Sequence, residues 1–168
     1  MYLCLSGRIL EKSDPRPCAA DFIRLASRAG YQGVGLRDWQ LGPSPDPGRI
    51  EEIAKALNDL GMSVCSITGS LKDVAALAPV ARRLGVKVLQ VSGTPQELSD
   101  AAGVLDGDMR IGPQMHTGGE YETVALAAAT LRRARDARVG VVVEPANHMF
   151  AGEKWSPKLF APLARRII

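Results

Sequence analysis

Short apolar runs alternate with amphipathic stretches along most of this sequence. The runs have the length and β-branched content of strands, whereas the stretches between them repeat apolar residues every three or four positions, as helices do. Several of these stretches end in glycine immediately before the next run, in RAG before YQGVGL, DLG before MSVCSI and RLG before VKVLQV. A glycine after the last turn is typical of a helix C-terminus. The pattern predicts an α/β protein built from a repeated βα unit.

Strands are predicted at residues 2–10, 31–37, 62–67, 86–91, 109–115 and 139–143. Helices are predicted at residues 18–29, 47–60, 71–84, 95–102, 124–134 and 157–168, with a loop that includes Ser44 at 41–47. Cap residues mark several helix starts, namely Asp46 with Pro47, Ser70 with Asp73, Thr94 with Glu97 and Thr117 with Glu120. Because no linker divides these roughly six βα units, we expect a single domain over residues 1–168.

Side chains suited to catalysis follow two of the predicted strands. His116 comes directly after the strand at 109–115, and Glu144 comes directly after the strand at 139–143. The stretch between these strands is an amphipathic helix, so the three elements form a β-α-β unit with parallel strands. Parallel strands end at the same edge of a sheet, where α/β proteins bind ligands. We therefore expect His116 and Glu144 to share one rim.

Composition and charge narrow the class of protein. Hydrophobic residues make up 46% of the chain and charged residues 23%, which is ordinary for a globular domain. The net charge is only +3, and the arginines are spread over predicted helix faces. This distribution does not indicate a nucleic-acid partner. The three cysteines lack CxxC spacing, which favours a reducing cytoplasm over a disulfide framework or a structural zinc site. Neither a membrane span nor a phosphate-binding glycine loop is predicted.

Four segments, YQGVGLR, LGMSVCSITG, ARRLGVKVLQVSG and VGVVVEPANH, together resemble the xylose isomerase-like TIM-barrel superfamily of sugar phosphate isomerases and epimerases. The resemblance implies a parallel (β/α) array, here an incomplete barrel without the last strands. It places Glu144 at the position of the superfamily's metal-binding glutamate. The sequence departs from the pattern at Gly35, where the superfamily has glutamate, and the superfamily's other metal ligands lie on later strands. A divalent metal (Mn²⁺, Mg²⁺ or Zn²⁺) is therefore expected to be weakly bound or absent.

Glu144 is the predicted catalytic residue and metal ligand because a carboxylate at the end of an apolar run needs a positive partner. The alternative is a glutamate that faces solvent or pairs with an arginine. His116 is the second predicted catalytic residue, and the alternative is a loop histidine with local hydrogen bonds. The predicted substrate-binding residues are Asn147, His148, Arg37 and Gln114. For Arg37 an ion pair with Asp38 is the alternative.

These residues predict a metal-assisted proton transfer on a small carbohydrate or hydroxy-carbonyl compound, as in an isomerase or epimerase. One alternative is a non-catalytic shortened relative, or a fragment, with a ligand-binding or structural role. Another is an open doubly wound sheet of the flavodoxin type. An abasic-site endonuclease would need more His, Asp and Glu residues. An incomplete barrel leaves strand edges near Tyr2 and Val143, so we expect either the C-terminal helix to cover the gap or two chains to form a homodimer.

Overall fold

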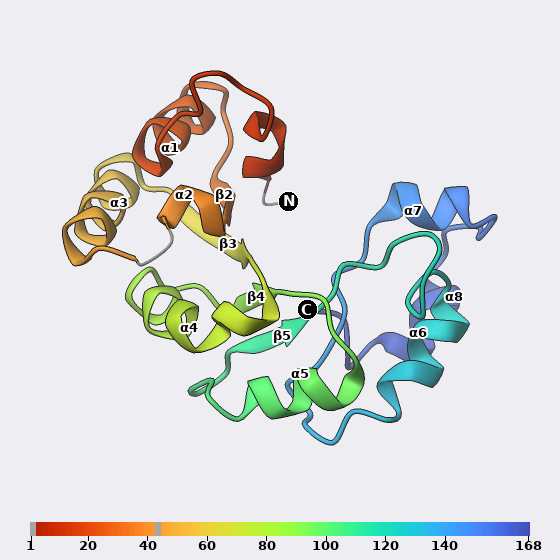
Figure 1. The fold of residues 1–168 in the computed structure, drawn as a ribbon. Helices are drawn as coiled ribbons and strands as arrows, with labels where there is room; N and C mark the ends of the chain where they lie inside the picture. The colour runs from red at the N-terminus through yellow and green to blue at the C-terminus, as the bar shows by residue number, and fades with distance from the viewer. Residues whose placement is uncertain (1–2, 43–44) are drawn as a thin grey trace. The chain divides into compact units, whose positions relative to one another are not determined.

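A computed structural model describes residues 3–42 and 45–168, so the predictions for Tyr2 and Ser44 lie outside the described residues. The chain divides into two compact units, Met1–Leu89 and Gln90–Ile168, in which strands alternate with helices (Figure 1). The strands follow one another in the order β1-β2-β3-β4-β5, which is also their order along the chain. This order confirms the predicted parallel array and excludes the strand reversal of a flavodoxin-type sheet. The prediction of one domain stays a prediction.

The first unit contains three consecutive parallel strands, with β1 paired to β2 and β2 to β3. Its elements are β1 (Cys4–Ser6), η1 (Gly7–Leu10), α1 (Ala19–Arg28), β2 (Gly33–Arg37), α2 (Asp38–Leu41), α3 (Pro47–Leu60), β3 (Ser63–Thr68), η2 (Leu71–Asp73) and α4 (Val74–Arg83), and β4 (Val88–Gln90) leads out of it. Val34, Leu36 and Ile67 are fully buried, as are Phe22 and Ile23 of α1. The core of this unit is therefore aliphatic, with one phenylalanine.

Local signals in the sequence predicted some helix starts correctly and others wrongly. Asp46 caps α3 by accepting a hydrogen bond from the amide of Arg49, and Gly61 ends that helix with a φ of +61°. The predicted first strand is shorter than expected because residues 7–10 form a 3-10 helix. The predicted capping box at Ser70 is wrong, since its side chain makes no cap hydrogen bond and a 3-10 turn precedes α4.

The second unit is built around β5 and the segment 139–142. Its elements are α5 (Pro95–Ala102), β5 (Arg110–Gly112), α6 (Val124–Leu131), α7 (Pro145–Phe150), α8 (Pro157–Phe160) and η3 (Ala161–Leu163). The predicted strand at 139–143 is present only as isolated parallel bridges, from Val139 to Ile111 and from Val142 to Gln114. A Cβ atom at Gly112 would collide with the carbonyl oxygen of Gly140, so the glycine at position 112 allows this close approach.

The end of the chain covers the edge that was predicted to stay open near Val143. The predicted helix at 157–168 stops at Leu163, and the last residues run parallel to the segment 139–142. The amide of Val141 donates to the carbonyl of Arg166 at 2.8 Å, and the amide of Ile168 donates to the carbonyl of Val141 at 3.0 Å. Backbone hydrogen bonds from the last residues therefore cover this edge, where a packed helix was expected to cover it. The homodimer stays a prediction.

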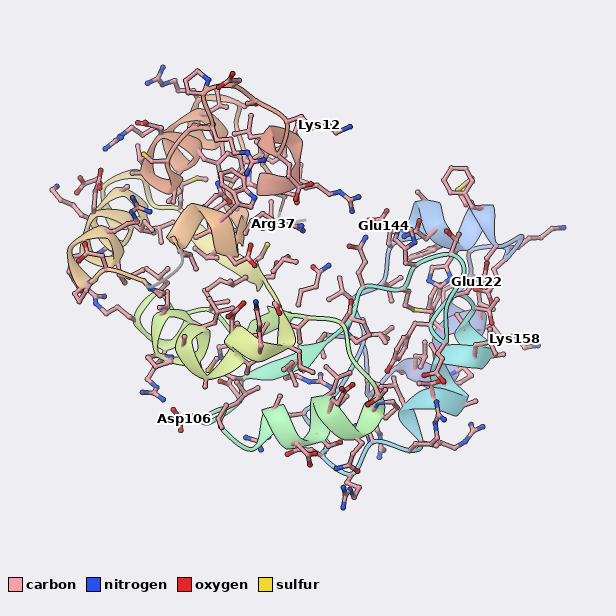
Figure 2. The ribbon with its side chains drawn as sticks, viewed as in Figure 1. Lys12, Arg37, Asp106, Glu122, Glu144 and Lys158 are labelled. Atoms are coloured by element: carbon pink, nitrogen blue, oxygen red, sulfur yellow. The ribbon has the colours of Figure 1, made fainter. Side chains whose placement is uncertain are left out.

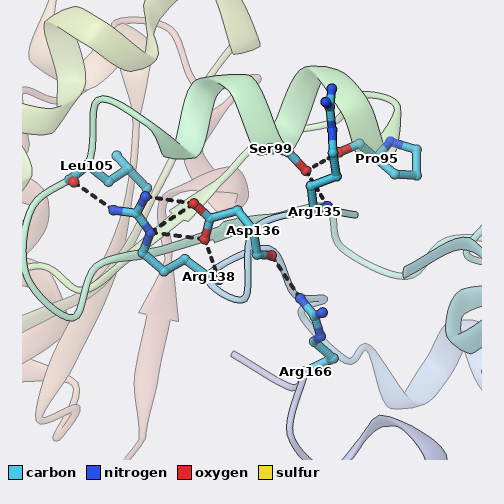
Figure 3. Close-up of polar contacts among 7 residues, drawn as sticks. All are labelled: Pro95, Ser99, Leu105, Arg135, Asp136, Arg138 and Arg166. Atoms are coloured by element: carbon cyan, nitrogen blue, oxygen red, sulfur yellow. Dashed lines mark hydrogen bonds and ion pairs between the residues drawn. The ribbon is translucent and has the colours of Figure 1, made fainter. Parts of the chain in front are cut away.

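A polar network anchors the turn that leads into segment 139–142 (Figure 3). The Arg138 guanidinium donates to the Asp136 carboxylate at 2.7 Å and to the carbonyl of Leu105 at 2.8 Å. Arg166 donates to the backbone carbonyls of Asp136 and Val139 at 2.9 and 2.8 Å. Because these contacts join the loop after α5, the turn and the chain end, they fix where segment 139–142 begins.

We expect Asp136→Asn to lower the free energy of unfolding by about 1–3 kcal/mol, since it weakens hydrogen bonds to a charged partner. Hydrogen bonding to Arg138 lowers the pKa of Asp136 below its ordinary value. A lowered pKa stabilises the fold above the unfolded-state pKa of about 4, and this contribution is lost as pH falls through the folded-state pKa. Urea unfolding of wild type and variant, from neutral pH to below pH ~4, measures how this contribution to the free energy of unfolding changes with pH. A constant difference between wild type and variant over that range would contradict it.

Candidate functional site

Glu144 lies where the segment 139–142 enters α7 (Figure 2). The residue is the N-cap of this short helix, Pro145 takes the first helical position, and the carboxylate accepts a hydrogen bond from the amide of Ala146 at 3.4 Å. Proline suits that position because its missing N–H would have no partner in the helix. The sequence Glu-Pro after an apolar run therefore presents a half-buried carboxylate at the strand end.

A chain of side-chain hydrogen bonds connects Glu144 with the ends of β4 and β5. The Gln90 amide donates to the Gln114 side-chain oxygen at 2.8 Å, and the Gln114 amide donates to the Glu144 carboxylate at 3.1 Å. All three side chains are half-buried, where hydrogen bonds are less weakened by water. The structure thus brings together Glu144 and Gln114, two of the predicted site residues. Gln90, the last residue of β4, extends this series of hydrogen bonds to a third strand end.

A cavity of about 320 Å³ lies beside Gln114, near the lower end of the range for small-molecule sites. Its walls come from the loops after β4 and β5 and consist of Ser92, Gly93, Thr94, Pro113, Gln114, His116, Thr117, Gly118, Gly119, Glu120 and Tyr121. His116 is exposed, and its Nδ1 lies 3.3 Å from the carbonyl oxygen of Thr117. Gln114 therefore touches both the cavity and Glu144, which is not itself among the lining residues.

Tyr121 is a cavity residue that the sequence did not reveal. Its hydroxyl is buried without a hydrogen-bond partner among the described residues. Burial, and secondarily the charge of Glu120, raise the pKa of Tyr121 to about 12, so the phenol stays protonated. A buried unpaired hydroxyl is costly and calls for an explanation. No periodicity or motif in the sequence singled out this tyrosine.

The predicted capping pair of Thr117 and Glu120 is wrong, because α6 begins only at Val124. Thr123 is its N-cap and accepts from the amide of Leu126. Glu120 forms an ion pair with Arg133 at 2.8 Å instead. The loop from 116 to 123 therefore runs up to the predicted helix start at 124, and it provides much of the cavity wall.

Asn147 and His148, both predicted to bind substrate, contact the protein itself. The Asn147 amide donates to the backbone carbonyl of Met115 at 2.9 Å. His148 has no exposed surface, its Nδ1 lies 2.7 Å from the Glu153 carboxylate, and its ring packs edge-on against Phe160 with 4.9 Å between centroids. Glu153 also accepts from the amide of Val124 at 3.1 Å. Through Glu153, His148 connects α7 to the start of α6. To contact a substrate, the His148 ring would have to become exposed.

Arg37 belongs to the first unit, at the end of β2 (Figure 2). Its guanidinium pairs with Glu11 at 3.0 Å, not with Asp38 as the sequence alternative held. Its backbone amide donates to the side chain of Gln40 at 2.9 Å. A role in substrate binding stays a prediction for this residue.

The donor set does not fit a tightly bound metal. Within residues 3–42 and 45–168, no group of three or more His, Cys, Asp or Glu side chains could hold a metal ion. Catalytic metal sites in proteins normally provide at least three protein ligands. Glu144 is one carboxylate, and its hydrogen-bond neighbour Gln114 points its amide N–H at it.

None of the helices in the described part of the chain combines the length and apolar character that a membrane crossing requires.

Comparison with known proteins gives one sequence match and many structural ones. No protein-family profile matches the chain. It is 27% identical over 142 residues to the biotin synthase of Histophilus somni (strain 2336), a match that covers 77% of this chain and 41% of that protein. The chain therefore spans less than half the length of this curated relative.

Solved structures match over almost the whole chain. The probable 3-DHS dehydratase AsbF of Bacillus anthracis superposes with a TM-score of 0.79 and 13% identity over 99% of this chain and 71% of that protein. D-psicose 3-epimerase, solved in the presence of D-fructose, superposes with a TM-score of 0.77 and 7% identity over 99% of this chain and 71% of that protein. A xylose isomerase-like TIM-barrel protein of Mycobacterium smegmatis in complex with magnesium superposes with a TM-score of 0.70 and 13% identity over 97% of this chain and 72% of that protein. The chain thus has the fold of the xylose isomerase-like TIM-barrel proteins.

Proposed function

We propose that this chain binds a small carbohydrate or hydroxy-carbonyl compound in the cavity beside Gln114 and His116, and that it moves a proton between adjacent carbons of that ligand. The observation that carries the proposal is the Gln114 side chain, which lines the cavity and donates to the Glu144 carboxylate at 3.1 Å. We expect the Glu144 carboxylate, which is separated from the cavity by the Gln114 side chain, to act as a base on a ligand bound there. The epimerase among the structural neighbours supports the reaction class.

The cavity wall favours a ligand rich in hydroxyl groups. It contains the hydroxyls of Ser92, Thr94 and Thr117, an amide and an imidazole, together with glycine backbone that a ligand can approach closely. Hydroxyls, amides and a neutral imidazole can each donate and accept, which matches sugar hydroxyls. The carboxylate in the wall, Glu120, is paired with Arg133. A small carbohydrate therefore fits this wall better than an apolar ligand does.

Two groups would handle the proton in this proposal. Glu144 would take it from a carbon next to a carbonyl group, with Gln114 and the Ala146 amide fixing the carboxylate. His116 would exchange a proton with the substrate oxygen, since its ring is exposed at the cavity wall. Because the described residues do not form a metal-ligand set, no step is assigned to a metal. Weak binding of Mn²⁺ or Zn²⁺ by Glu144 stays a proposal.

A non-catalytic carbohydrate-binding protein is the second candidate. The observation in its favour is the missing ligand set, because the reaction class named here commonly uses a metal to stabilise the enediolate. Both candidates use the same cavity. They differ in whether a bound ligand exchanges carbon-bound hydrogen with solvent.

The proton-transfer claim is tested by deuterium incorporation from solvent into a panel of free ketoses and aldoses. We expect exchange by wild type, and a fall of about 10²–10⁴-fold for Glu144→Gln, because a positioned acid or base contributes that much. Glu122→Gln is the matched control, since Glu122 lies in the same unit and outside the cavity wall. Binding without any exchange would favour the non-catalytic candidate. Equal exchange by Glu144→Gln and wild type would remove Glu144 from the mechanism.

The cavity itself is tested with Tyr121→Phe. The change removes a buried hydroxyl that has no partner, so the free energy of unfolding should stay within about 0.5 kcal/mol or rise. If the loop moves on binding so that a sugar pairs with this buried hydroxyl, affinity should fall roughly 2- to 10-fold, as for one lost hydrogen bond. Calorimetric titration and urea unfolding measure the two quantities. Unchanged affinity would show that a bound sugar does not pair with this hydroxyl.

A further inference from the structure

Two cysteine thiols lie on one face of the three-stranded sheet in the first unit. Cys4 of β1 is opposite Gly33 of β2. On the other side of β2, Val34 pairs with Val64 but Gly35 pairs with Ser66, so Cys65 is the extra residue of a bulge. Successive side chains of a strand alternate between faces. The buried side chain of Val34 occupies one face, and Cys4 and the two glycines occupy the other.

No side chain on the middle strand separates these thiols. A Cβ atom at Gly35 would lie 3.7 Å from the sulfur of Cys65, so the Cys65 thiol lies over this glycine of the middle strand. The two thiols also interact: burial, and then the neighbouring Cys65 thiol, raise the pKa of Cys4 to about 12. Both cysteines are free, with Cys4 half-buried and Cys65 exposed.

The spacing favours a bridging ion over a disulfide. Second-neighbour strands lie roughly 9–10 Å apart, whereas a disulfide needs Cα atoms within about 7 Å. A metal between two sulfurs spans about two metal–sulfur bonds of roughly 2.3 Å each, which is longer than the S–S bond of about 2 Å. An ion can therefore join thiols that cannot be oxidised to a disulfide without movement of the strands.

The number and softness of the donors select the ion. No third His, Cys, Asp or Glu completes a metal-binding group around these thiols within the residues that the structure describes. Zinc in structural sites takes four ligands, whereas soft thiolates select Cu(I), whose filled d shell accepts two ligands in a line. We propose that Cys4 and Cys65 bind one Cu(I) ion as a two-coordinate bis-thiolate. Each thiol loses its proton on binding, so one Cu(I) replaces two H⁺ and no oxidant is needed.

This site also accounts for the departure from the superfamily pattern at residue 35. A side chain there would begin 3.3 Å from the hydroxyl oxygen of Ser66 and 3.7 Å from the sulfur of Cys65, in the space beside the Cys65 thiol. The glutamate of the resembled pattern would therefore occupy this space. The site lies wholly in the first unit and does not depend on the proposed function.

The test is an anaerobic titration of the full chain with Cu(I) against a chromogenic Cu(I) chelator, followed by thiolate-to-copper absorption in the ultraviolet. We expect one ion per chain, two protons released, and loss of this binding in Cys4→Ser and in Cys65→Ser. Cys18→Ser is the matched control and should bind like wild type, because Cys18 caps α1 and is exposed. Binding that survives either single variant, or that is lost with Cys18, would overturn the proposal.

A second measurement uses wild type alone, in case a variant does not fold. Cu(I) should protect Cys4 and Cys65 together from alkylation, as read by mass spectrometry, while Cys18 stays reactive. Protection of one thiol only would contradict the site. An ion that brings chains together, seen as a dimer by light scattering, would show that the two sulfurs come from different chains and would also contradict it.

Discussion

The hydrogen bond from the Gln114 amide to the Glu144 carboxylate joins the framework of the second unit to its candidate chemistry. It can form because the segment 139–142 runs beside β5, and that approach requires Gly112. On the other side of the segment, Gly140 leaves room for the chain end at Arg166 and Ile168. At the other end of the segment, Asp136 and Arg138 fix the turn from which it starts. The position of Glu144 therefore depends on two glycines, one ion pair and one amide.

Short-range patterns were sufficient to predict the order of elements. Helix ends with a strong local signal, such as Asp46 before α3 and Gly61 after it, are formed by residues within one turn of each other. The capping pair of Thr117 and Glu120 failed for the opposite reason. Glu120 is held by Arg133, thirteen positions later, and a nearer threonine starts the helix. A spacing rule cannot weigh a local cap against a more distant ion pair.

The site was predictable in part. That Glu144 and Gln114 meet follows from parallel strands, because their strand ends share one edge. The burial of His148 does not follow from position along a strand, since it depends on Phe160 and Glu153 from the segment beyond α7. Tyr121 was missed because a loop tyrosine becomes informative only when its hydroxyl is found buried and unpaired.

A double-mutant cycle with Gln114→Leu and Glu144→Gln tests most directly whether this hydrogen bond links framework and site. The four free energies of unfolding come from urea denaturation at neutral pH. A coupling energy of about 0.5–3 kcal/mol is predicted, as for side chains in direct contact within one network. Additive effects, with a coupling energy near zero, would show that Gln114 does not hold Glu144 and would contradict the account.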